Sequence, residues 1–91
     1  MKTTIDEIHK LTIQKYGKLD MLNKAIQEMN ECSEAIRDFK NGMKNNFNLM
    51  EELQDVKNMI RKVELIAGFD SKECKEIQIN KMIRTYERLN N

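Results

Sequence analysis

The chain has 91 residues, of which 40% are hydrophobic and 34% are charged, and its formal net charge is +1. This length allows one domain with a modest core, and the near-zero charge argues against a nucleic-acid-binding surface. No apolar run approaches the roughly 20 residues of a membrane span, and the polar segment after Met1 is not a signal peptide, so we expect a cytoplasmic protein without a membrane partner. Cys32 and Cys74 have no Cys-x-x-Cys spacing, which predicts free thiols.

Two helices are predicted in the first half of the chain, where apolar residues recur every three or four positions. The first runs from about Ile5 to Tyr16 and ends at Gly17. The second runs from about Leu19 to Lys40 and ends at Asn41-Gly42, a strong helix-end signal. His9 lies beside the first apolar stripe without a clustered partner, so we expect a surface or rim histidine and not a metal ligand. The stripes expected to face the core are Ile5, Ile8, Thr12 and Tyr16 on the first helix, and Leu22, Ile26, Met29, Ser33 and Ile36 on the second.

Two further helices are predicted in the second half. Asn48 is a plausible N-cap for the third helix, with Glu51 completing a capping box, and this helix reaches about Ala67. Gly68 ends it, and Asp70 or Ser71 begins the fourth helix. No strand pattern appears and the connections are short, so the fold class predicted is an all-α four-helix bundle. The expected core stripes are Leu49, Leu53, Val56, Ile60, Val63 and Ala67 on the third helix, and Ile79, Met82, Ile83, Tyr86 and Leu89 on the fourth.

Two carboxylate pairs lie on successive predicted helices, Glu31 with Glu34 and Glu52 with Asp55. Residues three apart share one helix face, so two antiparallel helices would bring the four carboxylates together. Such a cluster repels itself unless protons or cations neutralise it, and oxygen ligands suit Mg²⁺ or Mn²⁺. Glu52 falls inside the apolar arc of the third helix, where a carboxylate is costly unless it is paired or bound to a metal. The pattern therefore predicts a metal site suited to phosphate chemistry.

The segments around these acids resemble the MazG-like, all-α nucleoside triphosphate pyrophosphohydrolases, in particular their small bacterial and phage members. The family signature is an E-E-x-x-E block on one helix and an E-x-x-D block on the next. Glu31-Cys32-Ser33-Glu34 and Glu52-Leu53-Gln54-Asp55 are similar to these blocks, with 17 residues between them. Asn30 stands where the family has the first Glu of its doublet. Glu28 with Glu31 and Glu51 with Asp55 offer another register, and the family context favours the first choice.

The resemblance implies a single MazG-like domain over residues 1–91 that cleaves the α–β phosphate bond of nucleoside triphosphates. The products would be a nucleoside monophosphate and pyrophosphate, and the biological role would be the clearing of nucleotide pools. The small members of the family assemble as dimers or as dimers of dimers, so we expect a homodimer or tetramer. The implied metal ligands are Glu31, Glu34, Glu52 and Asp55.

Single residues outside the acid pairs receive less specific assignments. Glu34 is the carboxylate we would choose as the base that activates water. Gln27 lies one turn before Glu31 and could contact a ribose or phosphate, although a surface Gln on a helix is the simpler interpretation. Lys81 and Arg84 could contact the triphosphate or could interact with the helix dipole near the end of the chain. The alternative function is a non-enzymatic helical interaction protein, or a regulatory protein that binds metal and nucleotide without turnover.

Overall fold

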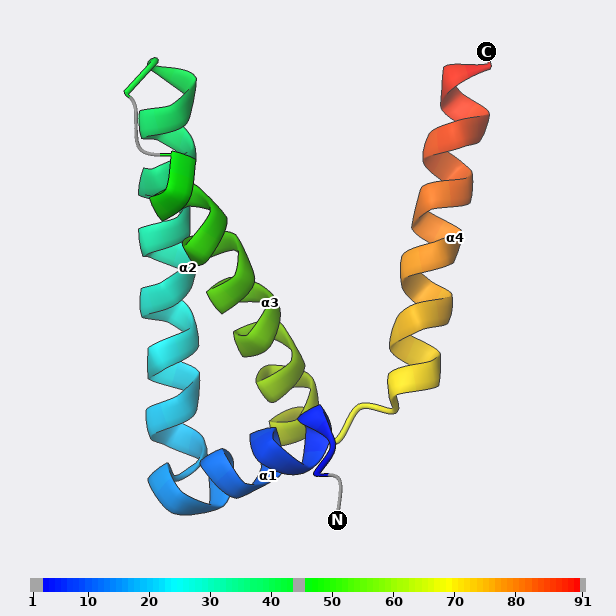
Figure 1. The fold of residues 1–91 in the computed structure, drawn as a ribbon. Coiled ribbons are helices and arrows are strands. Elements are labelled where there is room, and N and C mark those ends of the chain that lie inside the picture. The colour runs from blue at the N-terminus through cyan, green and yellow to red at the C-terminus, as the bar shows by residue number, and fades with distance from the viewer. Residues whose placement is uncertain (1–2, 44–45, 91) are drawn as a thin grey trace.

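The computed structural model of the chain describes residues 3–43 and 46–90, and these form four helices and no strand. They are α1 (Ile5–Tyr16), α2 (Lys18–Lys40), α3 (Asn46–Ala67) and α4 (Ser71–Leu89). The four helices predicted from the sequence are therefore confirmed. In Figure 1, α2 and α3 form a long hairpin, α1 crosses the base of that hairpin, and α4 stands apart from the other three. None of the helices within the described residues is long and apolar enough to cross a membrane.

The helix ends follow local signals in the sequence. Thr4 caps α1 and forms a reciprocal capping box with Glu7. Gly17 takes a φ of 92°, which lets the chain turn sharply between α1 and α2. The Asp70 side chain accepts a hydrogen bond from the Glu73 amide and caps α4. The prediction that Asn48 caps α3 is wrong, because the helix already begins at Asn46.

The core between α2 and α3 is small and differs from the predicted one. The buried residues of α2 are Ala25, Glu28, Cys32 and Ala35, and the buried residue of α3 is Met59. The stripe predicted for α2 is wrong, since its bulky members remain exposed to solvent. The physical reason is that small side chains allow the closest approach of two helices, so α3 packs on the Ala/Cys side of α2. The exposed members are Ile26, Met29, Ser33 and Ile36.

The stripe predicted for α1 is also wrong, and so is the surface position of His9. His9 is only 5% exposed, whereas Ile5, Ile8 and Tyr16 are more than half exposed. A paired carboxylate determines this orientation. Arg61 of α3 donates two hydrogen bonds of 2.9 Å to the carboxylate of Asp6, one turn before His9 on the same side of α1. This bidentate pair turns that side of α1 toward α3.

Helix α4 does not complete a bundle within this chain. Its only partly buried residue is Cys74, whose thiol lies beside Glu64 of α3. Every other residue of α4 is exposed, including the apolar stripe that was expected to face the core. Burial and the neighbouring Glu64 raise the pKa of the Cys74 thiol, and both Cys74 and Cys32 are free cysteines, as predicted.

Candidate metal and phosphate site

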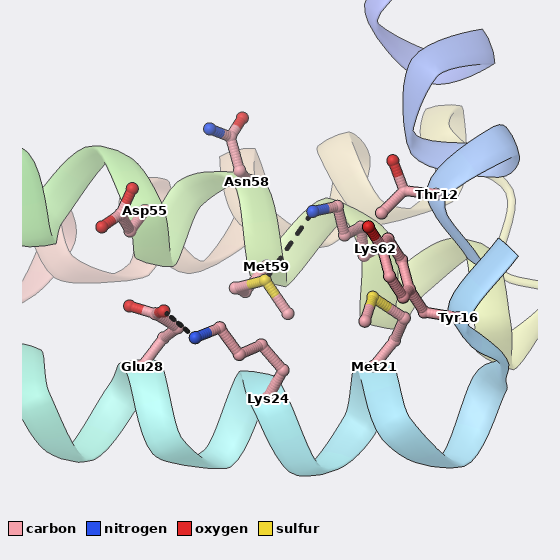
Figure 2. Close-up of a pocket in the computed structure, with 9 residues that line it drawn as sticks. All are labelled: Thr12, Tyr16, Met21, Lys24, Glu28, Asp55, Asn58, Met59 and Lys62. Atoms are coloured by element: carbon pink, nitrogen blue, oxygen red, sulfur yellow. Dashed lines mark hydrogen bonds and ion pairs between the residues drawn. The ribbon is translucent and has the colours of Figure 1, made fainter.

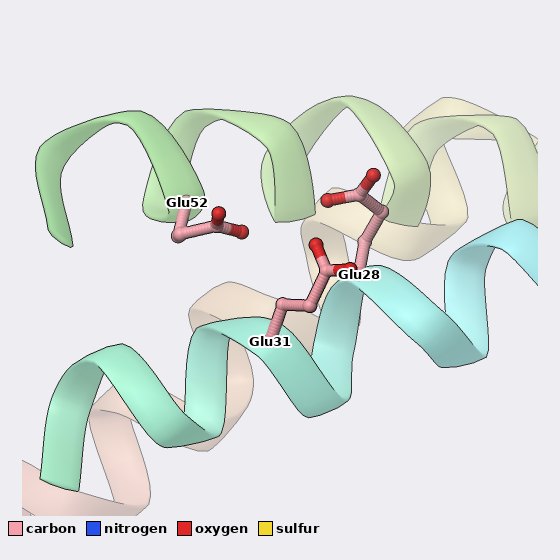
Figure 3. A group of neighbouring side chains, drawn as sticks. All are labelled: Glu28, Glu31 and Glu52. Carbon is pink, nitrogen blue, oxygen red and sulfur yellow. The ribbon is translucent and has the colours of Figure 1, made fainter. Parts of the chain in front are cut away.

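Three glutamates from the two long helices meet in the α2–α3 hairpin. Glu28 and Glu31 come from α2 and Glu52 from α3, and each can place one carboxylate oxygen within 4.8 Å of the others (Figure 3). Glu28 is 8% exposed, while Glu31 and Glu52 are half-buried. Three carboxylates this close together favour the binding of a proton or a cation.

This crowding affects the titration of Glu52. Burial raises the pKa of the Glu52 carboxyl, and the negative charges of Glu31, Glu28, Asp55 and Glu51 raise it further. Its Oε2 atom is shielded from solvent and has no hydrogen-bond partner among the described residues. A shielded carboxylate oxygen without a donor is unusual in folded proteins, and a bound cation would satisfy it.

Two polar neighbours already orient the glutamates of α2. Lys24 forms an ion pair of 3.1 Å with Glu28, one turn away. The Gln27 amide donates a hydrogen bond of 3.1 Å to Oε1 of Glu31, also one turn away. Gln27 therefore holds a carboxylate of the site in position, and its predicted contact with substrate stays a prediction.

The structure brings together only part of the ligand set expected from the sequence. Glu31 and Glu52 meet, but Glu34 is exposed and lies outside the group of three, and Glu28 takes its place. Asp55 is exposed and lies at the edge of the neighbouring pocket. The signal that could have identified Glu28 is its position among the small residues of α2, since it lies three residues after Ala25 and four before Cys32.

A pocket of about 430 Å³ lies beside the acidic group, between α1, α2 and α3 (Figure 2). Glu28 and Asp55 form its acidic side, and Lys24 and Lys62 bring two ammonium groups to it. The Lys62 ammonium lies 3.9 Å from the sulfur of Met59. The pocket is also lined by the aromatic ring of Tyr16 and the amide of Asn58. Carboxylates for a cation and lysines for an anion therefore occur side by side.

The cations assigned to the last helix are not part of this site within one chain. Lys81 and Arg84 lie on α4, where with Thr85 and Arg88 they line a separate hollow of about 240 Å³. Both side chains are exposed, and α4 projects away from the hairpin (Figure 1). Their predicted contact with the triphosphate stays a prediction.

The chain matches no protein-family model, no curated protein and no solved structure. The resemblance to the MazG-like enzymes therefore rests on the residues of the two acidic blocks, and the function proposed for the site follows from its own geometry.

Proposed function

We propose that the protein is a Mg²⁺-dependent nucleoside triphosphate pyrophosphohydrolase of the MazG-like type, acting on nucleotide pools in the cytoplasm. The observation that carries this proposal is the group of Glu28, Glu31 and Glu52 beside a pocket that two lysines also line. A triphosphate complexed with a divalent cation needs both features, because its metal requires oxygen ligands and its phosphates require cationic donors.

The residues present fit a hard divalent cation. All three ligands are carboxylates, which suit Mg²⁺ and Mn²⁺ better than softer metals. The shielded Oε2 of Glu52 has no hydrogen-bond partner within the described part of the chain, as expected of an atom whose partner is an ion. The ligand set that we now propose is Glu28, Glu31 and Glu52, with Asp55 completing it from the pocket edge. When bound, Mg²⁺ would supply neutralisation of phosphate charge and a lower pKa for a coordinated water.

Other residues of the pocket would bind the phosphates and the nucleoside and activate the attacking water. Lys62, whose ammonium has the Met59 sulfur as a hydrogen-bond partner among the described residues, is the side chain best placed to bind a phosphate oxygen. Lys24 holds Glu28 before substrate binds and is a second phosphate donor. Asn58 presents an amide and Tyr16 a ring to the pocket, where a nucleoside would lie. Glu52 is better placed than the exposed Glu34 to act as base for the attacking water, because it belongs to the group of carboxylates beside the pocket.

The test is pyrophosphate release from a panel of ribo- and deoxyribonucleoside triphosphates, each assayed with and without Mg²⁺. We expect turnover of at least one triphosphate, dependence on Mg²⁺ or Mn²⁺, and equal amounts of monophosphate and pyrophosphate. Release of inorganic phosphate in place of pyrophosphate would mean that a phosphate bond other than the α–β bond is cleaved. The absence of any turnover over the whole panel would overturn the enzymatic assignment.

A second candidate is a helical regulatory protein that binds metal and nucleotide without turnover and contacts another protein through its apolar surface. The observation that favours it is the large exposed apolar surface of α2 and α4. Titration of Mg²⁺ and a non-hydrolysable triphosphate followed by calorimetry separates the cases. Binding without turnover of the cleavable substrates would support this candidate, and absence of binding would exclude both it and the enzyme.

A further inference from the structure

The chain exposes more surface than a folded monomer of its size. Its accessible area is 7725 Å², whereas a monomer of 10.8 kDa is expected to expose about 5,500 Å². Its radius of gyration is 16.1 Å, against about 12 Å expected for a compact chain of 91 residues. The surplus of about 2,200 Å² exceeds the roughly 800 Å² that each partner buries in a standard interface and lies in the range of obligate dimers.

One apolar surface lies on the hairpin, on the side away from the pocket. The pocket-lining residues Lys24 of α2 and Asp55 and Lys62 of α3 mark one edge of the α2–α3 contact. On a helical wheel the exposed apolar residues of both helices lie at the other edge. They therefore form one continuous face, which we call the hairpin face. It consists of Ile26, Met29 and Ile36 of α2 with Leu53 and Ile60 of α3.

The other apolar surface is one side of α4, which we call the α4 stripe. Its members recur every three or four residues, the period of a helix that is made to pack. Nothing in the described part of the chain covers them, and each is between 48% and 77% exposed. They are Ile79, Met82, Ile83, Tyr86 and Leu89.

The direction of α4 is determined by its short linker to α3. Gly68, with a φ of 77°, donates its amide to the carbonyl of Leu65, and Phe69 donates its amide to the carbonyl of Glu64. These two bonds form a Schellman motif, which satisfies the end of α3. Asp70 then caps α4 directly. The linker leaves α4 standing away from its own hairpin (Figure 1), so its stripe is available to another molecule.

The charges along one edge of the two surfaces are complementary, although the side of α4 that carries the stripe also carries Lys72 and Lys75 in its first two turns. The side of α2 that carries the hairpin face also carries Lys18, Arg37 and Lys40, and no acid. One edge of the α4 stripe carries Glu76 and Glu87. The lengths also match, since α4 with 19 residues is about 28 Å long and α2 with 23 residues is about 34 Å long.

We propose that two copies of the chain form a two-fold dimer in which α4 of each copy packs on the hairpin face of the other. Each copy contributes its α4 stripe to the other copy and receives the other's α4 on its own hairpin face. The two-fold dimer therefore covers both apolar surfaces and leaves none for a third copy. The partner is a second copy of this chain, and the acidic group stays on the uncovered side of each hairpin. The proposal does not depend on the proposed function, because the hairpin face and the acidic group lie at opposite edges.

A matched pair of serine substitutions tests the role of α4. Ile83 of the stripe and Ile77 on the opposite side of α4 are similarly exposed, at 49% and 56%. Sedimentation equilibrium at micromolar protein should give twice 10.8 kDa, or a multiple of this mass, for the wild type and for Ile77→Ser. Ile83→Ser should weaken association at least about tenfold at unchanged helicity, because it removes a buried anchor from the centre of the contact. A wild-type monomer, or equal behaviour of the two variants, would overturn the proposal.

Charge reversal with mixing tests whether the contact joins two copies. One variant carries Glu76→Lys and Glu87→Lys on α4, and the other carries Arg37→Glu and Lys40→Glu on α2. Each alone should associate at least about tenfold more weakly than the wild type, because like charges then face each other. An equimolar mixture should restore the dimer, since both contacts of the mixed dimer are again complementary. If mixing does not restore the dimer, α4 packs on its own hairpin or elsewhere, and the proposed packing of α4 on the other copy is wrong. Neither result bears on pyrophosphate release, so the two proposals can fail separately.

Discussion

Replacing Glu28 by Gln, with Glu34→Gln as the matched control, separates the two possible ligand sets of the proposed metal site. Both residues lie on α2, and both substitutions remove one negative charge without changing the size of the side chain. Glu28 belongs to the group of three carboxylates, whereas Glu34 is exposed and lies outside it. We therefore expect only Glu28→Gln to lose the response to Mg²⁺.

The size of the response follows from mass action. At Mg²⁺ concentrations about 100 times the dissociation constant, binding to the native state adds about 2.7 kcal/mol to the free energy of unfolding. For a domain of this size that corresponds to a rise in Tm of roughly 10–20 °C. Loss of one of three carboxylate ligands should weaken binding by about 100-fold, which leaves about 0.4 kcal/mol and a rise of only about 2–3 °C.

The assay is thermal unfolding followed by circular dichroism at fixed protein concentration, with Mg²⁺ increased in steps and ionic strength held constant. The wild type and Glu34→Gln should show parallel increases in Tm, while Glu28→Gln should stay nearly flat. The opposite order would mean that Glu31 and Glu34 form the site, as the family context suggested. If the wild type itself does not respond to Mg²⁺, the three carboxylates hold no divalent cation and the reasoning from their geometry fails.

Three shorter predictions concern charge and packing in α1 and α3. Glu52→Gln should abolish pyrophosphate release and leave the Tm of the metal-free protein equal or higher, because it relieves repulsion between carboxylates. Glu51→Gln should keep turnover, and similar losses of turnover for both variants would contradict the assignment of Glu52 to the metal site. Burial and the nearby Lys62 lower the pKa of His9, so the unfolded chain binds the proton more readily and stability should fall as the pH drops below about 6.5; urea unfolding at pH 7.5 and 5.5 should show a smaller loss for His9→Gln. Met59→Ala should lower the free energy of unfolding by urea by about 2–5 kcal/mol, because it leaves a cavity at the centre of the α2–α3 contact. A loss below about 1 kcal/mol would mean that neighbouring side chains fill this cavity.

The positions of the helices could be predicted from the sequence because they depend on local interactions. A glycine follows α1 and α3, and Asp70 caps α4, so the bounds of these helices were readable from single residues and their neighbours. The start of α3 was missed by two residues, since its apolar pattern is weak in the first turn. Two acids of the candidate site were also identified: Glu52 because a carboxylate within an apolar arc needs a partner, and Glu31 because it was paired with the acids of the next helix and matches the family context.

Which side of each helix faces inward was decided only by the tertiary structure. Counting apolar residues selected the bulky stripe of α2, but α3 packs on Ala25, Cys32 and Ala35, and this rotation brings Glu28 into the site in place of Glu34. The Asp6–Arg61 pair, which joins residues 55 positions apart, likewise turns His9 inward. The physical reason is that an amphipathic helix has a preferred apolar side whatever covers it, and a single chain does not show whether its own helices or a second copy provide the cover. Local pattern thus determined where the helices are, and long-range packing determined which residues form the site.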